Sequence, residues 1–196
     1  SHDEDWKFDL SRLLDQMEEM GELENTIIAY VSDHGCHLGD QGIYQKQSMY
    51  DVSARVPYVL SGTGIAEGSV INTPVNAGTI LPTVLECADI DVPDHAEFRS
   101  LAGTVSTGNE PEDLPVFSEV DFGVWNGYRL GERFVMARRG KWKLALFRDP
   151  LKHTGYEAGD DMMLYNLEKD SGERNNLAEE AQYADSITDI IRLIDE

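Results

Sequence analysis

The sequence has few basic residues, few cysteines and no long apolar run. Its 196 residues include 16 Lys and Arg against 37 Asp and Glu, a formal net charge of −21. So acidic a surface repels nucleic acids and anionic membranes, and neither is expected as a partner. No stretch approaches the roughly 18 apolar residues of a membrane span, and two cysteines in unlike contexts do not indicate a disulfide framework.

What is present suffices for a packed core. Hydrophobic residues make up 41% of the chain, and 196 residues allow one or two domains. The acidic residues are dispersed, and arginine outnumbers lysine. This pattern suggests the cytoplasm of a salt-tolerant organism, where salt screens self-repulsion. An ordinary acidic protein, including a secreted one, is the alternative.

The first half of the chain reads as alternating helix and strand. Apolar residues recur at helical spacing from Trp6 to Met17, and Gly21 closes that helix. The β-branched and aromatic run at 26–31 predicts a buried parallel strand, and a long loop with three glycines follows it. A second strand beginning at Pro57 and a helix at 79–88 come next, and the polar stretch 90–113 indicates a linker.

The second half changes to short strands. Alternating and apolar runs predict a small antiparallel sheet, with strands at 115–120, 133–138, 142–147 and 162–167. The middle two are joined as a hairpin, and an amphipathic helix at 181–194 closes the chain. We therefore predict an α/β domain over 1–110 and a small four-stranded α+β subdomain over 111–196.

The segment Ser32-Asp33-His34-Gly35 is the strongest functional signal. In α/β sheets ligands bind just beyond the carboxyl ends of strands, and this segment follows one directly. Asp33 and His34 can together hold a divalent cation, and Lys46, twelve residues further, can neutralise an anion bound to that cation. A capping aspartate and a structural histidine are the alternative reading of the pair.

The wider segment resembles the sulfatase family. The family pattern runs S-D-H-G, then glycines and a lysine, then R-V-P, an apolar strand and a glycine-rich turn, and the chain matches it from Ser32 to Ile65. Downstream, Leu81-Pro82-Thr83-Val84-Leu85 resembles a family helix. The stretch from Leu164 to Leu177 resembles the family's terminal segment. The resemblance therefore covers nearly the whole chain.

The resemblance implies a fold and a set of roles. The fold would be the C-terminal part of an alkaline-phosphatase-like α/β sandwich, followed by its small antiparallel subdomain. Asp33 and His34 would be two ligands of the family's Ca²⁺. Lys46 would bind a sulfate oxygen and stabilise the charge that develops on it, and a cation plus an ammonium suits such a transition state. His37 would line the substrate cleft.

The family's nucleophile is missing from the sequence. Sulfatases convert a cysteine in C-x-P-S-R or C-x-A-x-R context to formylglycine, and neither Cys36 nor Cys87 has that context. We therefore interpret the chain as the C-terminal portion of a longer enzyme. Its partner would be the N-terminal half of the same protein, its calcium site would be incomplete, and the chain alone would be inactive.

Several residues depart from the pattern or allow a second reading. Gln41 stands where the family often has histidine, which leaves a proton-transfer role there in doubt. Cys36 beside His37 could be a thiolate nucleophile, although nothing in the sequence supplies an orienting third group. We interpret Arg55 as a structural ion pair. Four further side chains are interpreted as solvated: His95, Arg138, Arg139 and His153.

The sequence as a whole predicts a sulfuric ester hydrolase acting on a small sulfate ester. A phosphate or phosphonate ester hydrolase of the same superfamily is one alternative, and a non-catalytic binding fragment is another. The residues upstream would distinguish them, because each class has its own nucleophile. Trp125 and Tyr128, in the loop 121–132, could form a rim of the substrate site.

Overall fold

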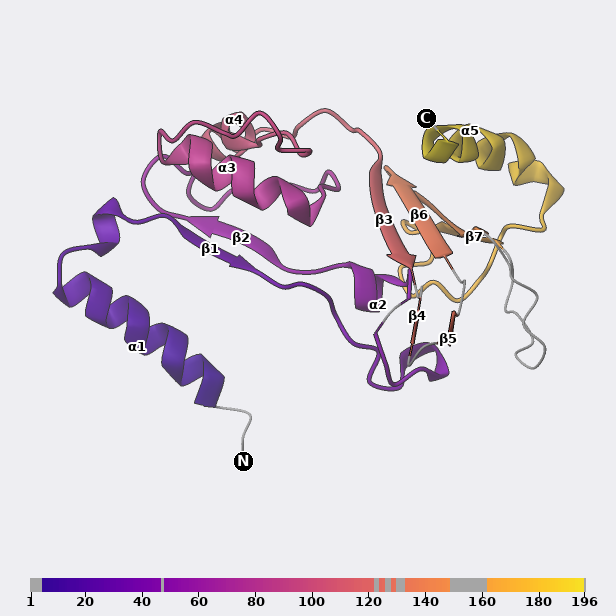
Figure 1. Ribbon diagram of the computed structural model, residues 1–196, viewed down its shortest axis with the longest axis horizontal. Coiled ribbons are helices and arrows are strands. Elements are labelled where there is room, and N and C mark those ends of the chain that lie inside the picture. Colours follow the sequence, from indigo (N-terminus) through magenta and orange to yellow (C-terminus); the bar gives the residue numbers. More distant parts are fainter. Residues whose placement is uncertain are drawn as a thin grey trace. The chain divides into compact units, whose positions relative to one another are not determined.

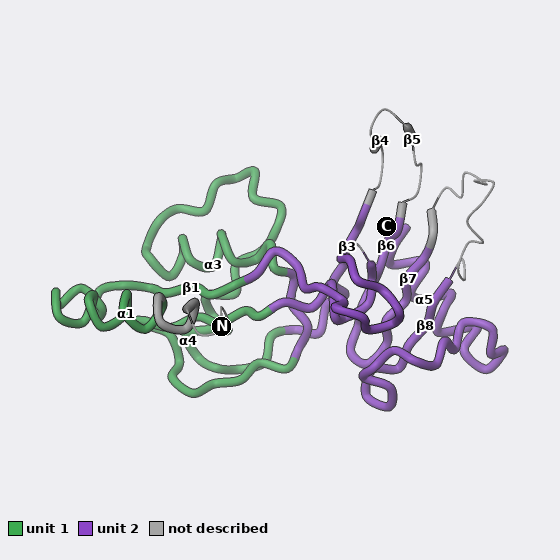
Figure 2. The backbone as a smooth tube through the Cα atoms, turned by 90° about the horizontal axis from the view of Figure 1, so that it is seen from below, with its two compact units in different colours: residues 1–31, 57–72, 77–111 green, residues 32–56, 73–76, 112–196 purple. Residues whose placement is uncertain are grey.

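The computed structural model describes residues 5–46, 48–121, 124–125, 128–129, 133–148 and 162–195 (Figure 1). Its contacts group the chain into two compact units (Figure 2). The first unit comprises residues 1–31, 57–72 and 77–111, and the second comprises 32–56, 73–76 and 112–196. The predicted domain division after residue 110 stays a prediction. The contact grouping differs from it by joining the loop 32–56 to the C-terminal residues.

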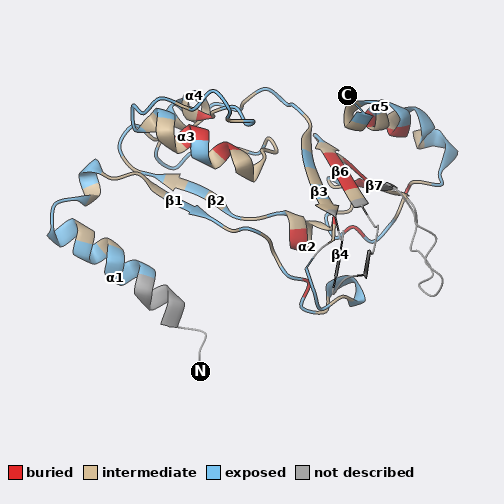
Figure 3. Cartoon of the chain, in the orientation of Figure 1, coloured by how far each residue is buried: buried red, intermediate tan, exposed pale blue. Residues whose placement is uncertain are grey.

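The first unit begins with helix α1 (Asp5–Glu19) and strand β1 (Ile28–Val31). Gly21 ends the helix in the left-handed region at φ +71°, as predicted. Strand β1 pairs antiparallel with β2 (Tyr58–Ser61), and three of the four residues of β1 are exposed in this chain (Figure 3). The prediction of a buried parallel strand was therefore wrong, because an apolar run does not specify the direction of its neighbour.

Helix α3 (Ile80–Cys87) confirms the predicted helix, and α4 (Ala102–Thr107) packs against it. The backbone N–H of Leu101 donates to Thr83 Oγ1 at 2.9 Å, and Thr83 is fully buried. The linker prediction for 90–113 was wrong over this part. The Gly, Ser and Thr residues of α4 have low helix propensity, so tertiary contacts rather than local sequence hold this short helix.

The second unit contains the predicted antiparallel sheet, in the order β3-β6-β7-β8. Its strands are β3 (Val116–Asp121), β6 (Arg133–Arg139), β7 (Trp142–Arg148) and β8 (Met162–Asn166). The β6–β7 hairpin turns through Gly140 at φ +52°, as a tight turn requires. Two short strands, β4 (Val124–Trp125) and β5 (Tyr128–Arg129), pair with each other. The predicted rim side chains of Trp125 and Tyr128 lie outside the described side chains.

This sheet is covered on both faces. Helix α5 (Ala184–Asp195) packs on one face, where Leu144 and Leu164 are fully buried. On the other face Met49, from the loop 32–56, packs against Met136 and Ala145. The short helix α2 (Asp51–Ala54) begins two residues after Met49. The loop that carries the predicted site residues is thereby anchored to the C-terminal sheet.

Short 3-10 turns complete the described elements, at Leu23–Asn25, Asp40–Gly42, Ala77–Thr79 and Ala181–Tyr183. Among the described residues, no helix combines the length and the apolar character needed to cross a bilayer.

Candidate functional site

Asp33 and His34 lie directly after β1 and contact each other. The backbone N–H of His34 donates to Asp33 Oδ1 at 2.8 Å, and Asp33 Oδ2 lies 3.3 Å from His34 Nε2. Ser32 Oγ donates to the His34 carbonyl at 3.1 Å, which tightens the turn. The Asp33 side chain is 82% exposed and that of His34 is 37% exposed. The pair therefore presents an oxygen and a nitrogen on the open side of the turn.

The tautomer of His34 follows from its hydrogen bonds. Nδ1 lies 2.8 Å from the carbonyl oxygen of Gly35. Since a carbonyl can only accept, Nδ1 carries the proton, and the Nε2 of a neutral ring keeps a free lone pair. Metal-binding histidines are commonly fixed in this way, by a backbone carbonyl on the other nitrogen.

Lys46 completes the predicted group. Its Nζ lies 2.5 Å from His34 Nε2, so the ammonium donates to that lone pair. The side chain of Lys46 is exposed. The structure thus brings Asp33, His34 and Lys46 together, although Lys46 is twelve residues from His34 in the sequence.

The electrostatics of Asp33 suit a cation ligand. The pKa of its carboxyl is lowered from the ordinary value, chiefly because the backbone N–H of His34 donates to it, and the His34 ring adds to the effect when it is protonated. Asp33 is therefore an anion at neutral pH. Within the described residues, however, no group of three or more His, Cys, Asp or Glu side chains is arranged to hold a metal ion.

Gly35 fixes the backbone beside His34. Its N–H donates to the carbonyl oxygen of Ser53, in α2, at 2.8 Å. A Cβ at this position would lie 2.1 Å from the carbonyl oxygen of Val52. Only glycine permits so close an approach of the two backbones, which explains why the motif ends in glycine.

His37 is placed differently from its prediction. It is 1% exposed, and both ring nitrogens are engaged, Nδ1 with the Asp40 carbonyl at 3.0 Å and Nε2 with Ser48 Oγ at 2.6 Å. Its ring also packs edge-on against Tyr50. The proposed substrate contact of His37 stays untested, but this environment argues for a structural role in the loop.

The neighbouring cysteine does not form a catalytic pair. Cys36 Sγ lies 3.7 Å from the Tyr44 carbonyl oxygen, and the His37 nitrogens are bonded to other groups. The side chains of Arg55 and His95 are exposed, and the described residues provide no ion pair for Arg55. His153 lies outside the described residues.

Sequence reasoning missed a buried charge cluster in the second unit. Lys143, on β7, is 1% exposed, and its Nζ lies 2.6 Å from both Asp51 Oδ1 and Glu173 Oε1. Arg138, on β6, places Nη1 3.6 Å from Asp51 Oδ2, so it is not simply a solvated charge. The available signal was a lysine inside the otherwise apolar run 142–147, since a lysine buried there needs carboxylate partners.

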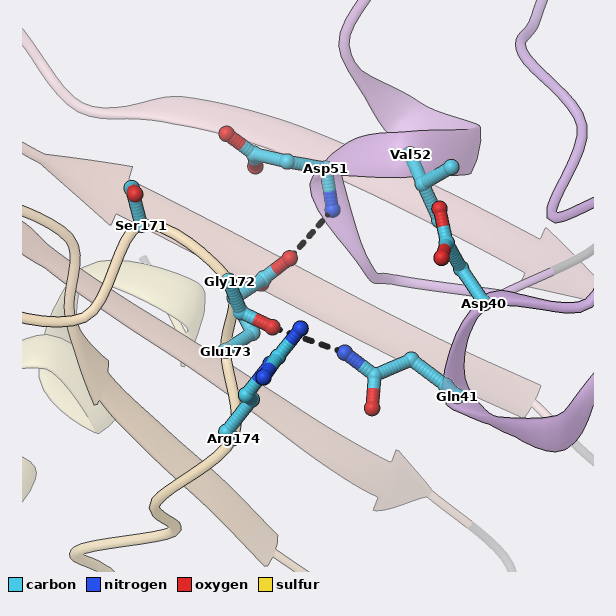
Figure 4. A pocket seen from close by; sticks show the side chains of 8 residues that line it. All are labelled: Asp40, Gln41, Asp51, Val52, Ser171, Gly172, Glu173 and Arg174. Carbon is cyan, nitrogen blue, oxygen red and sulfur yellow. Dashed lines mark hydrogen bonds between the residues drawn. The ribbon is translucent and has the colours of Figure 1, made fainter.

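A pocket of about 390 Å³ lies beside this cluster (Figure 4). It is lined by Asp40, Gln41, Asp51, Val52, Ser171, Gly172, Glu173 and Arg174. Two contacts cross it: Gln41 Nε2 donates to the Gly172 carbonyl at 2.7 Å, and the Asp51 N–H donates to Glu173 Oε2 at 2.5 Å. Gln41, where the family often has histidine, therefore ties the site loop to the segment after β8.

Burial raises the pKa of Glu173, and this effect exceeds the opposing attraction of Lys143. In the folded protein the carboxyl therefore keeps its proton to a higher pH than in the unfolded chain, where it titrates near its ordinary value of 4.5. Just above that pH the folded state binds more protons, so the free energy of unfolding falls as the pH rises through the folded pKa.

Glu173→Gln is expected to remove this decline, because glutamine does not titrate. The measurement is urea denaturation of both proteins from about pH 4 to about pH 7, with the free energy of unfolding compared at each pH. The wild type should lose stability relative to the variant as the pH rises. A difference that stayed constant, or grew in favour of the wild type, would contradict the assignment.

The chain matches a family model described as "Sulfatase" over residues 9–90. It is 29% identical to the N-acetylglucosamine-6-O-sulfatase of Bacteroides thetaiotaomicron, over 95% of this chain and 32% of that protein. It is 32% identical to the choline-sulfatase of Rhizobium meliloti, over 87% of this chain and 30% of that protein. The chain thus spans about a third of the length of the curated relatives it matches.

The fold comparison agrees. A solved structure described as a complex with its substrate D-glucosamine-2-N,6-O-disulfate has a TM-score of 0.78 and 28% identity, over 94% of this chain and 36% of the other. The phosphonate monoester hydrolase of Agrobacterium radiobacter has a TM-score of 0.77 and 25% identity, over 95% and 38%. The α/β fold and these matches are consistent with a member of the sulfatase family of the alkaline-phosphatase-like superfamily.

Proposed function

We propose that the protein is a sulfuric ester hydrolase, and that this chain supplies metal ligands and a sulfate-binding lysine but not the nucleophile. One observation carries the proposal: Asp33 Oδ2, His34 Nε2 and Lys46 Nζ meet at the open end of one turn. A carboxylate, an imidazole lone pair and an ammonium together suit a cation and an anion bound side by side.

The residues present fit part of a divalent metal site. His34 is held in the tautomer that leaves a lone pair on Nε2, and the pKa of Asp33 is lowered, so both could donate to a cation that displaces Lys46 from Nε2. We propose Ca²⁺, by likeness to the family, although a hard cation prefers oxygen to the His34 nitrogen. A Ca²⁺ ion takes about six to eight ligands, and Asp33 and His34 supply two, so the N-terminal part of the same protein would supply the rest.

The proposed chemistry is charge stabilisation at a sulfate ester. The bound cation would polarise a sulfate oxygen as a Lewis acid. Lys46 would donate hydrogen bonds to the sulfate and to the charge that shifts onto the departing oxygen. Asp33 would balance the positive charge, and Gly35 would keep His34 in register with α2. The attacking group would come from outside this chain.

Two relatives and one solved complex are compatible with a small sulfate ester as substrate. One is named a 6-O-sulfatase of N-acetylglucosamine, another a choline-sulfatase, and the solved complex holds a disulfated glucosamine. The net charge of −21 also opposes a long sulfated polyanion. A phosphonate ester hydrolase is the second candidate, because an enzyme of that name has a TM-score of 0.77 to this chain. The predicted salt-rich cytoplasmic or secreted location stays a prediction.

The test uses the full-length protein. It would be purified, and hydrolysis of an aryl sulfate, an aryl phosphate and a phenyl phosphonate ester would be compared at equal concentrations. A sulfatase should cleave the sulfate ester with the highest kcat/KM, lose activity on treatment with a chelator, and regain it with Ca²⁺. Preference for the phosphonate ester would support the second candidate. Absence of turnover on all three would leave only a binding role.

A further inference from the structure

Two cationic side chains lie opposite each other on the two central strands of the C-terminal sheet. Arg138 on β6 and Lys143 on β7 are directly opposite in the strand register. Like charges at such positions repel, and Lys143 is also removed from water. The carboxylate of Asp51 lies between them, with Oδ1 on Lys143 and Oδ2 on Arg138. The sheet therefore holds Asp51 at a fixed place by charge.

Glu173 holds the same residue from the other side. It lies in the segment after β8, where its backbone adopts a left-handed φ of +52° that non-glycine residues rarely adopt. Asp170 fixes this segment, because Oδ2 accepts the backbone N–H groups of Arg174 at 2.9 Å and Asn175 at 2.8 Å. From this rigid turn Glu173 Oε2 accepts the backbone N–H of Asp51, the first residue of α2 (Figure 4).

Helix α2 carries this constraint to the predicted site. Asp51 is its first residue, and Ser53, which is 4% exposed, accepts the N–H of Gly35. The carbonyl of Gly35 in turn accepts the proton of His34 Nδ1. A continuous series of contacts thus runs from the sheet through one helical turn to the imidazole. Every residue in this series is less exposed than Asp33.

We propose that Lys143 and Glu173 are positioning residues. Through Asp51 and α2 they set the orientation of His34 and the position of the loop 32–56. This inference rests on the proposed function only for its effect on turnover. The geometry itself predicts a measurable change at Gly35 in any case. Loss of either residue should let α2 shift, weaken the Gly35–Ser53 hydrogen bond, and misplace the cation and sulfate contacts without removing any of them.

The experiment compares Lys143→Met and Glu173→Ala with Glu173→Gln in the full-length protein. Glutamine keeps an oxygen that can accept the Asp51 N–H, so Glu173→Gln should retain most of the wild-type behaviour. The other two should lower kcat/KM for the sulfate ester by about tenfold or more, as loss of residues that orient metal ligands commonly does. Their amide hydrogen exchange at Gly35 should rise by a similar factor, measured well below the melting temperature.

Two control variants separate positioning from simple loss of stability. Leu164→Ala removes a fully buried side chain from the opposite face of the same sheet. It should lower the melting temperature while leaving kcat and Gly35 exchange unchanged at low temperature. Lys141→Met removes an exposed lysine from the β6–β7 hairpin and should change neither kcat nor Gly35 exchange.

The inference is overturned if Gly35 exchange in Lys143→Met and Glu173→Ala equals that of the wild type. It is also overturned if Leu164→Ala raises that exchange as much as they do. Should the wild type hydrolyse no sulfate ester, the proposed function fails, and the exchange measurement still decides the positioning role.

Discussion

Lys46→Ala in the full-length protein is expected to lower kcat/KM for a sulfate ester by about a hundredfold or more, about 2.7 kcal/mol of transition-state stabilisation. The ammonium of Lys46 lies against His34 Nε2, where a bound cation and its sulfate would meet. Its attraction grows as negative charge moves to the departing oxygen, so the loss should fall on kcat as well as on KM. Lys46→Arg should recover only part of the activity, because the guanidinium fork is wider than the ammonium.

The melting temperature separates this loss from misfolding. Lys46 is exposed, and an exposed lysine contributes little to stability, so the variant should unfold at the wild-type temperature. Lys169→Ala, which removes another exposed lysine, is the matched control and should keep full activity. Near-normal turnover of Lys46→Ala with a normal melting temperature would show that Lys46 is a solvated loop charge.

Gly35→Ala is expected to disable the site through backbone displacement. The new Cβ would lie 2.1 Å from the Val52 carbonyl oxygen, so the Gly35 or α2 backbone must move. A displacement of about 1 Å at a catalytic group can cost about a hundredfold in rate, and overpacking of this kind costs about 1–3 kcal/mol of stability. Both kcat/KM and the melting temperature should therefore fall, and the Gly35–Ser53 hydrogen bond should be lost.

Gly103→Ala supplies the control for that substitution. Gly103 lies in α4, and a Cβ there would meet no atom within 4 Å. Alanine is favoured over glycine in a helix by about 0.5–1 kcal/mol, so this variant should be slightly stabilised and fully active. If Gly35→Ala matched Gly103→Ala in activity and melting temperature, the close approach of the two backbones at Gly35 would not be needed for function.

The parts of the fold that local sequence specifies were predicted correctly. The β6–β7 hairpin follows from two apolar runs around Gly140, and the end of α1 follows from Gly21. Strand direction and the helix α4 were not, because neither leaves a periodic or composition signal: β1 is an apolar run that fits either direction, and α4 contains helix-disfavouring residues.

For the site, the sequence predicted which residues meet but not what supports them. Asp33, His34 and Lys46 share a loop whose spacing matches a family pattern, so their proximity could be expected. The contacts of Asp51 with Lys143 and Glu173 join residues 92 and 122 positions apart, and no local pattern encodes such pairs. The burial of His37 could not be predicted either, because the sequence around a loop histidine does not indicate whether it faces solvent or packs against Tyr50.

The shared unit of the site loop and the C-terminal sheet bears on how the protein can be divided. Residues 32–56 contain every predicted site residue. However, Met49 packs on that sheet, and Asp51 is bonded to Lys143 on β7 and to Glu173 after β8. A fragment cut after residue 110 would keep Asp33, His34 and Lys46 but lose the surface on which their loop is folded. Such a fragment would contain the site residues but not the contacts that hold their loop in its conformation. An expressed version meant to bind a cation must therefore extend at least through Glu173.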